Sequence, residues 1–290
     1  MKVFSMFSGI GGFELGLEQS NLEHQLIGFS EIDKYAISIF EQKFQGVKNY
    51  GDATTIRGDE LPDFDLLVGG FPCQSFSVAG LQKGFGDTRG TLFFDIARIC
   101  SEKRPRYLVL ENVRGLLSHD GGKTFQTILR VLADLGYGVE WQVLNSKNFG
   151  VPQNRERVFI VGYLGGRSGR QIFPIAREVR EASVAKVRQE NLVDIIDKKG
   201  KSKNKKVAST LAGGAHSGGN HSDMDLLVTF GAGLRIRRLT PTECERLQGF
   251  PDGWTEGLSD TQRYKTLGNA VTVNVVEAVM NSFAKVEEIG

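Results

Sequence analysis

The sequence predicts an α/β protein with a second, smaller and loop-rich domain. Through the first half of the chain, short apolar runs alternate with helix-like stretches, which is typical of a parallel sheet wrapped by helices. From Gly165 to about Gly233 the chain instead becomes polar, basic and glycine-rich, with poor periodicity. The length of 290 residues is enough for one large core or for two lobes.

The apolar runs of the first half predict six strands, and the stretches between them predict helices that cross from one strand to the next. Strands are expected at residues 3–7, 25–30, 64–69, 107–110, 139–144 and 157–162. Helices are expected at residues 13–19, 34–44, 91–102 and 124–135. In such a sheet the carboxyl ends of the strands meet at one edge, where ligands bind.

Regular structure resumes near Leu239. Thr240, Pro241 and Glu243 form a capping box with proline at the first helical position, and Gly249 is expected to end that helix. A last helix is expected at residues 273–284. We therefore predict a large domain of residues 1–164, completed by 263–290, and a small domain of residues 165–262.

Composition narrows the setting of the protein. The net charge is only +2, and lysines concentrate between Lys198 and Lys206, where a solvated loop is the simplest interpretation. No run approaches the ~18–20 apolar residues of a membrane helix, and the N-terminal residues are expected to form a first core strand rather than a secretion signal. The three cysteines form no CxxC pair, so neither a disulfide framework nor a zinc site is expected. A reducing cytoplasm is the expected location.

A glycine turn and two acidic residues indicate a cofactor site. In FSGIGGFELG, Gly9, Gly11 and Gly12 lie between the first strand and its helix, where backbone can approach a ligand closely. The spacing differs from the dinucleotide-binding fingerprint. Glu31, after the second strand, could accept both ribose hydroxyls, and Asp52 could receive an adenine amino group. Each acid alone could equally be a surface residue or helix cap, but together they favour an adenosine-bearing cofactor.

Chemically useful side chains follow the next strands. Cys73 lies in a Gly/Pro/Ser-rich loop at a strand end, whereas Cys100 fits a buried structural cysteine on a helix. Glu111 ends the following strand and is either a helix cap or a site residue. Arg155 and Arg157 are two apart at the start of a strand, so they point to the same face. They could form a surface ion-pair face or, in this crevice, bind anionic or carbonyl oxygens.

With these motifs in order, the sequence resembles the cytosine-5 DNA methyltransferase family of restriction–modification systems. The matching blocks are FSGIGGF, EIDKYA, GGFPCQSFSVAG, RGTLFF, ENV, QNRERVFIVG, LTPTECERLQGFPD and YKTLGNAVTVNV. The likeness covers both ends of the chain and excludes only about residues 165–234. It implies a Rossmann-like, S-adenosylmethionine-dependent methyltransferase sheet, with the small domain recognising the target DNA.

The resemblance also implies a role for each matching position. Cys73 corresponds to the nucleophile that attacks a flipped-out cytosine, Glu111 to the residue facing its ring nitrogen and amino group, and Arg155 with Arg157 to further partners of the base. The loop 74–90 resembles a mobile loop that closes over DNA, with Gln74, Ser75, Ser77 and Arg89 as DNA contacts. The residues expected to hold S-adenosylmethionine are Phe7, Gly9, Gly12, Glu31, Ile32, Asp52, Pro72, Leu92 and Asn269.

The expected partner is double-stranded DNA, and no membrane partner is expected. The protein is expected to be a bacterial or phage-encoded monomer. A cognate restriction endonuclease is a possible further partner that would act independently. Three other functions remain open. A tRNA cytosine methyltransferase would share the catalytic blocks, although the LTPTECERLQGFPD block and the basic lobe favour DNA. A catalytically silent DNA-binding relative would not need the intact Cys73, Glu111 and Arg157. A dehydrogenase would bind a nicotinamide cofactor, for which the glycine spacing is wrong.

Overall fold

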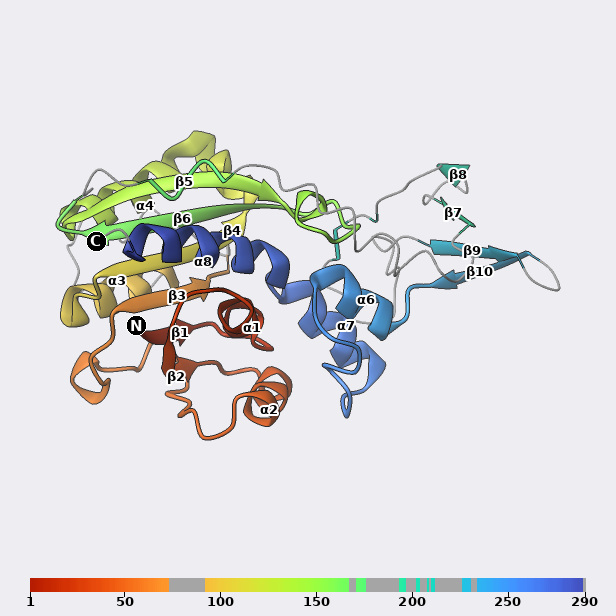
Figure 1. Ribbon diagram of the computed structural model, residues 1–290, viewed down its shortest axis with the longest axis horizontal. Helices are drawn as coiled ribbons and strands as arrows, with labels where there is room; N and C mark the ends of the chain where they lie inside the picture. The colour runs from red at the N-terminus through yellow and green to blue at the C-terminus, as the bar shows by residue number, and fades with distance from the viewer. Residues whose placement is uncertain are drawn as a thin grey trace.

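A six-stranded sheet forms the centre of the molecule in the computed structural model (Figure 1). The structure describes residues 1–72, 92–166, 171–175, 193–196, 202–203, 208, 210–211, 226–230 and 234–288. The strand order is β2-β1-β3-β4-β6-β5. Their bounds are β1 (Lys2–Met6), β2 (Gln25–Ser30), β3 (Leu66–Gly70), β4 (Tyr107–Val113), β5 (Tyr137–Asn145) and β6 (Glu156–Leu164).

The helices of the first half lie where the sequence predicts them, within two residues at each end. They are α1 (Gly12–Glu18), α2 (Lys34–Lys43), α3 (Leu92–Lys103) and α4 (Lys123–Asp134). In the second half, the structure has α6 (Pro241–Gln248), α7 (Asp260–Asn269) and α8 (Val273–Glu288). The last of these extends beyond the predicted end at residue 284.

One strand departs from the parallel arrangement that the alternating pattern indicates. The strands β2, β1, β3 and β4 run parallel, but β6 is antiparallel to both β4 and β5. Residues 146–155 connect β5 to β6 with only a short 3-10 turn, η5 (Ser146–Asn148). Because this connection contains no crossover helix, the chain can only return alongside β5 in the opposite direction.

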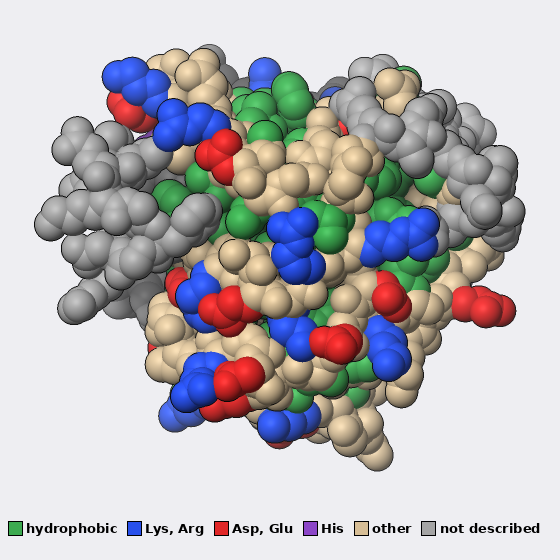
Figure 2. All heavy atoms as spheres, turned by 90° about the vertical axis from the view of Figure 1, so that its left-hand side faces the viewer, with side chains coloured by type: hydrophobic (Ala, Val, Ile, Leu, Met, Phe, Trp, Pro, Cys, Tyr) green, Lys and Arg blue, Asp and Glu red, His purple; other side chains and the backbone are tan. Residues whose placement is uncertain are grey.

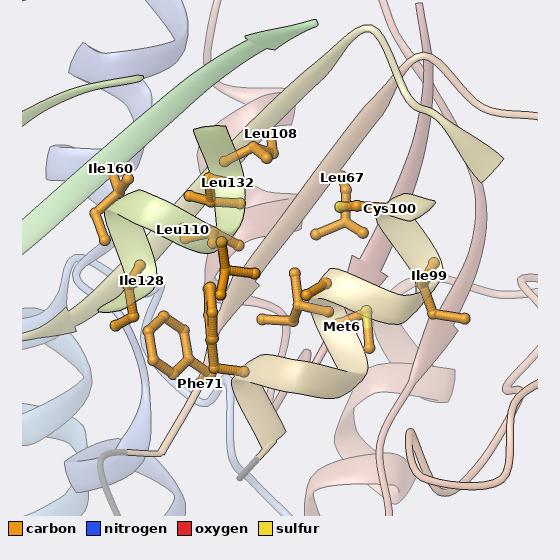
Figure 3. Close-up of a cluster of buried hydrophobic side chains, with 14 of the residues drawn as sticks. Met6, Leu67, Phe71, Ile99, Cys100, Leu108, Leu110, Ile128, Leu132 and Ile160 are labelled. Carbon is orange, nitrogen blue, oxygen red and sulfur yellow. The ribbon is translucent and has the colours of Figure 1, made fainter. Parts of the chain in front are cut away.

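Alternation along the strands divides the core between the two faces of the sheet. Met6, Leu67 and Ile160 pack with α3 and α4 on one face (Figure 3). Val3, Val68, Val109 and Val161 belong to the cluster that contains α1 and α8. Both faces are therefore covered by helices, and the strand ends are left as the place for a site.

A third apolar cluster joins the two ends of the chain. It contains Phe29 of β2 and Phe40 of α2 together with Leu247 of α6 and Trp254. The indole Nε1 of Trp254 donates a 2.9 Å hydrogen bond to the carbonyl of Ile10 in the glycine turn. Residues 239–254 thus share a core with the N-terminal part of the chain, and the domain division at residue 262 stays a prediction.

The start of α6 has the expected capping box. Thr240 Oγ1 accepts a hydrogen bond from the Glu243 N–H, and the Glu243 carboxylate accepts one from the Thr240 N–H. Pro241 occupies the first turn, and Gly249 ends the helix with a left-handed φ of 81°. These predictions from local sequence are confirmed.

A small antiparallel sheet extends away from the central sheet (Figure 1). Its order is β10-β9-β7-β8, formed by β7 (Val193–Ile196), β8 (Ser202–Lys203), β9 (Leu226–Phe230) and β10 (Leu234–Arg238). The sequence predicted a loop-dominated lobe here. The strands were missed because they are only two to five residues long and lie among polar, glycine-rich neighbours.

The face shown in Figure 2 carries basic and acidic side chains side by side, without a large patch of one sign. This face lies on the side where the N-terminus and the start of β1 are found in Figure 1. Its mixed charge gives it no strong preference for a polyanion. In the part of the chain that the structure describes, no helix is long and apolar enough to span a membrane.

Candidate active site

The carboxyl ends of β1 to β4 open on a cleft of about 620 Å³. This volume suits a ligand of cofactor size. Thr266, Gly268 and Asn269 of α7 form a second wall of the cleft. The cleft-lining residues that the sequence singled out are Phe7, Gly9, Glu31, Ile32, Asp52, Pro72, Leu92, Glu111, Arg155, Arg157 and Asn269.

Glu31 organises the glycine turn at one end of the cleft. Its Oε2 accepts a 2.8 Å hydrogen bond from the Gly9 N–H, while Oε1 accepts from the N–H groups of Ile32 and Asp33. A carboxylate offers about four acceptor positions, so three backbone donors leave capacity for a ligand hydroxyl at Oε2. Gly9 has φ +57° and open space where a Cβ would lie, so a ligand can approach the backbone here.

Gly12 has a different environment from Gly9. A Cβ at this position would lie 2.8 Å from Val271 Cγ1 and 3.0 Å from the Val271 carbonyl oxygen. Gly12 is not among the cleft-lining residues. It is needed so that the start of α1 can pack against the C-terminal segment, and a direct role toward a cofactor stays a prediction.

Two further side chains give this end of the cleft a mixed character. Ile32 is 70% exposed, which is unusual for a large aliphatic residue, and it lines the cleft. Asp52 also lines the cleft, and its Oδ1 accepts hydrogen bonds from the N–H and hydroxyl of Thr54. An apolar surface beside carboxylates suits a flat ring that carries polar groups.

Glu111 and Arg157 form a buried ion pair at the other end of the cleft. Arg157 Nε lies 3.0 Å from Glu111 Oε1, and the two residues come from the adjacent strands β4 and β6. Glycine at position 70 keeps the space beside Glu111 open, since the Cβ of any other residue there would lie only 3.2 Å from Glu111 Oε2. Burial raises the pKa of Glu111 above its ordinary value, although the positive charges of Arg157 and Arg155 oppose this shift.

Arg155 serves as a buried link between three parts of the chain. Its Nη1 donates to the carbonyl of Leu211, and its Nη2 donates to the carbonyls of Gly268 and Ala270, at 2.8 to 3.1 Å. Burial and the nearby Arg157 lower the pKa of Arg155 to about 9, which leaves it charged at neutral pH. These bonds fix the turn that carries Asn269. Because the Arg155 guanidinium donates to these backbone carbonyls, the ion pair with Glu111 is made by Arg157.

Asn112 is a site residue that the sequence reasoning missed. It is 2% exposed; its Nδ2 donates a 2.7 Å hydrogen bond to the Phe71 carbonyl, and its Oδ1 accepts from the Val113 N–H. It thereby holds Phe71 and Pro72, which directly precede Cys73. A buried amide next to Glu111 at a strand end was the available signal.

The predicted nucleophile Cys73 and the predicted DNA contacts Gln74, Ser75, Ser77 and Arg89 lie outside the described residues. Cys100, for which a structural role was predicted, is fully buried in the core on α3. Burial raises the pKa of its thiol to about 12, so it does not ionise near neutral pH.

The central sheet, its helical layers and the cleft at its carboxyl edge define a Rossmann-like fold of the S-adenosylmethionine-dependent methyltransferase class. Dnmt2 methyltransferase from S. pombe matches this fold with a TM-score of 0.75, at 18% identity, over 100% of this chain and 99% of that one. The methyltransferase EhMeth from Entamoeba histolytica matches with a TM-score of 0.76, also at 18% identity and over the same shares of the two chains.

The chain belongs to the C-5 cytosine-specific DNA methylase family, whose family model matches residues 1–222 and 208–285. The type II methyltransferase M.NlaX of Neisseria lactamica is 39% identical, over 96% of this chain and 94% of its own length. M.HhaI of Haemophilus parahaemolyticus is 34% identical, over 96% and 93% of the two lengths. The predicted family and enzyme class, DNA (cytosine-5-)-methyltransferase, are confirmed.

Proposed function

We propose that the protein transfers a methyl group from S-adenosylmethionine to carbon 5 of cytosine in duplex DNA, through a covalent adduct with Cys73. The observation that carries this proposal is the single cleft that joins the Gly9–Glu31 turn to the Glu111–Arg157 pair. A methyl donor held at the first feature and a base held at the second would meet within one cavity. The family match supports the reaction type.

The residues of the cleft fit S-adenosylmethionine. Glu31 retains acceptor capacity for ribose hydroxyls, Ile32 offers an apolar surface for the adenine ring, and Asp52 offers a carboxylate for its amino group. The remaining proposed cofactor residues are Phe7, Gly9, Gly12, Pro72, Leu92 and Asn269. When bound, the cofactor supplies a methyl group on a sulfonium, which departs as a neutral thioether.

The protein groups supply the activation of the base. Carbon 5 of cytosine is a weak nucleophile, but addition of the Cys73 thiolate at carbon 6 turns the ring into an enamine that can take the methyl group. Protonated Glu111 would donate a hydrogen bond to the ring nitrogen and draw charge from the adduct. Loss of the carbon-5 proton to solvent and of the sulfur from carbon 6 then restores the aromatic base and the thiolate.

Duplex DNA hides carbon 6, so the target base must leave the stack at a cost of a few kcal/mol. We propose that the Gln74–Gly90 loop closes over the flipped base, with Gln74, Ser75, Ser77 and Arg89 as DNA contacts. The small domain, residues 165–262, would read the target sequence in the major groove. The Gln153–Ala208 bridge and the Arg155–Leu211 hydrogen bond attach this domain to the cleft.

The proposed working form is a monomer in a reducing cytoplasm, where a reactive thiol is preserved. The bacterial and phage origins of the relatives are in keeping with this setting. Several relatives are type II methyltransferases, so a separate restriction endonuclease is a further proposed component of the system.

The function is tested by expressing the chain in a host without cytosine methylation and mapping 5-methylcytosine across the genome by bisulfite sequencing. We expect methylation at one short recurring motif, and none with the Cys73→Ala variant. Parallel assays on duplex DNA and on tRNA distinguish the main alternative. Methylation of tRNA alone, or no modified cytosine in either substrate, would contradict the proposal.

A further inference from the structure

An ion pair joins the two walls of the cleft, and the proposed chemistry does not use it. Lys265 Nζ lies 2.7 Å from Asp33 Oδ2, although the residues are 232 positions apart in the sequence. Asp33 caps the start of α2, and Lys265 lies in α7. Their side chains are 26% and 27% exposed, which places the pair at the partly solvated rim rather than in the core.

On the first wall, Asp33 is linked by hydrogen bonds to the glycine turn. The Asp33 N–H donates to Glu31 Oε1 at 2.9 Å, and Glu31 Oε2 accepts from the Gly9 N–H at 2.8 Å. Asp33 Oδ1 accepts from the Tyr35 N–H, which caps α2. A shift of Asp33 would therefore displace Glu31 and Gly9, the two groups that define this end of the cleft.

On the second wall, Lys265 directly precedes residues that line the cleft. Thr266, Gly268 and Asn269 all contribute to the lining, as does Asp33 on the first wall. Away from the cleft lining, the close packing of Gly12 on Val271 joins the glycine turn to the segment that follows α7. At the rim, the Lys265–Asp33 pair joins the same two walls, so it governs how far they stand apart at the mouth.

Asp33 is ionised at neutral pH. Burial opposes ionisation of Asp33, but the hydrogen bonds from Lys265 and from the Tyr35 N–H lower the pKa of its carboxyl below the ordinary value. Partly exposed ion pairs contribute little to the free energy of unfolding. Their effect on binding can be larger where they pre-organise a site, because a ligand then does not have to order it.

We propose that Lys265 is a positioning residue that sets the affinity for the adenosyl cofactor. It holds Asp33, and through Asp33 the carboxylate of Glu31, in place against the wall that carries Asn269. Lys265 touches neither cofactor nor base in this account. The inference rests on the proposed use of S-adenosylmethionine and adds a residue that controls its binding.

The test is calorimetric titration of the full-length protein with S-adenosylhomocysteine. Lys265→Met is expected to raise Kd by about tenfold, the equivalent of about 1.4 kcal/mol, because the charge is lost while the aliphatic stem remains. The kcat at saturating donor should change less than twofold. Lys265→Arg should restore Kd to within about threefold of wild type, because it retains the charge.

Lys103 offers a matched control. It pairs with Asp63 at the end of α3, away from the cleft, and Lys103→Met removes the same type of ion pair. This control should leave Kd unchanged. Thermal melting without ligand checks that each variant is folded, and Lys265→Gln is the second variant should Lys265→Met not fold.

Asp33→Asn completes a double-mutant cycle. Asparagine caps a helix as well as aspartate, so this change keeps the α2 cap but removes the charge that Lys265 meets. The double variant Lys265→Met/Asp33→Asn should bind no more weakly than the weaker single variant. Fully additive losses, a Lys265→Met protein that binds like wild type, or failure of Lys265→Arg to rescue would each overturn the inference. Absence of binding by the wild-type protein would instead refute the proposed function.

Discussion

At the scale of single residues, Glu111 is held between two opposing influences. Burial favours its neutral form, whereas Arg157 at 3.0 Å favours the carboxylate. A carboxyl in this position can be protonated when a neutral base displaces water from the cleft, and it can then donate the hydrogen bond that the covalent adduct requires.

Glu111→Gln tests this role. The amide keeps the size of the side chain and can still donate a hydrogen bond, but it is far less acidic than a carboxylic acid and so draws less charge from the adduct. We expect kcat to fall about 100-fold or more, as when a preorganised stabilising group is lost, while Kd for S-adenosylhomocysteine changes less than threefold. Single-turnover methylation assays and calorimetry measure the two quantities. A variant with normal kcat would show that the acidity of Glu111 does not contribute to the rate.

Asn112 is expected to act on the rate through the start of the Cys73 loop. Asn112→Asp preserves shape but lacks the N–H donor that binds the Phe71 carbonyl, so the peptide before Pro72 and Cys73 loses its anchor. We expect kcat to fall about tenfold or more, as small misplacements of a reacting group do, without a change in cofactor affinity. Equal losses in kcat and cofactor affinity would instead indicate a general structural role for Asn112.

Glu14 on α1 is a buried acid whose two carboxylate oxygens have no hydrogen-bond partner among the described residues. Burial raises its pKa from 4.5 to about 7. The folded state therefore keeps a proton that the unfolded state has lost, and stability declines as pH rises from about 4.5 to about 7. This decline amounts to about 3 kcal/mol.

Glu14→Gln remains neutral and should lack that decline. The free energy of unfolding of Glu14→Gln minus that of the wild type should therefore be about 2–3 kcal/mol larger at pH 8 than at pH 4. Urea denaturation of both proteins at the two pH values measures the difference. If the stability difference between variant and wild type is the same at pH 4 and pH 8, Glu14 is not protonated in the folded state.

At the scale of elements, the predictable parts were those with strong local signals. Lys34–Lys43, Lys123–Asp134 and the capping box at Thr240 follow from periodicity and caps. The reversed direction of β6 and the strands of the small sheet did not follow. The direction of β6 depends on which strands it pairs with in the folded sheet. The short strands of the small sheet are likewise defined by pairing with residues distant in the sequence.

The contact between α1 and α8 shows a further limit of sequence reasoning. Gly16 lies inside α1, where glycine is unfavourable, but a Cβ there would lie 2.5 Å from Val276 Cγ1 and 3.1 Å from the Val273 carbonyl oxygen. The residue is required by a helix more than 250 positions away in the sequence. No local pattern reveals that requirement.

Gly16→Ala is expected to reduce the free energy of unfolding by about 1–2 kcal/mol, because overpacking exceeds the gain in helix propensity. Gly115→Ala is the matched control, since an added Cβ there would meet only Val113 Cγ2 at 4.0 Å. Chemical denaturation compares the two. Equal stability of the two variants would show that the α1–α8 contact tolerates the extra methyl group.

At the scale of the whole molecule, the site depends on segments from both ends of the chain. The glycine turn and Glu31 come from the first 31 residues, Glu111 and Arg157 from the middle strands, and Asn269 from the end of α7. The strand ends could be predicted from the alternating pattern, whereas cleft residues such as Leu92 and Asn269 were expected only through the family resemblance. The links made by Arg155, Asn112 and Lys265 could not, because each joins residues whose proximity only the folded chain defines.

The most direct test of the account is covalent trapping with duplex oligonucleotides that contain 5-fluorocytosine across a broad pool of sequences, with S-adenosylmethionine supplied. Fluorine at carbon 5 cannot leave as a proton does, so the adduct between Cys73 and carbon 6 should persist through denaturing electrophoresis. We predict a DNA-linked band with the wild-type protein and none with Cys73→Ala. A wild-type protein that methylates ordinary cytosine but forms no such band would contradict the covalent mechanism.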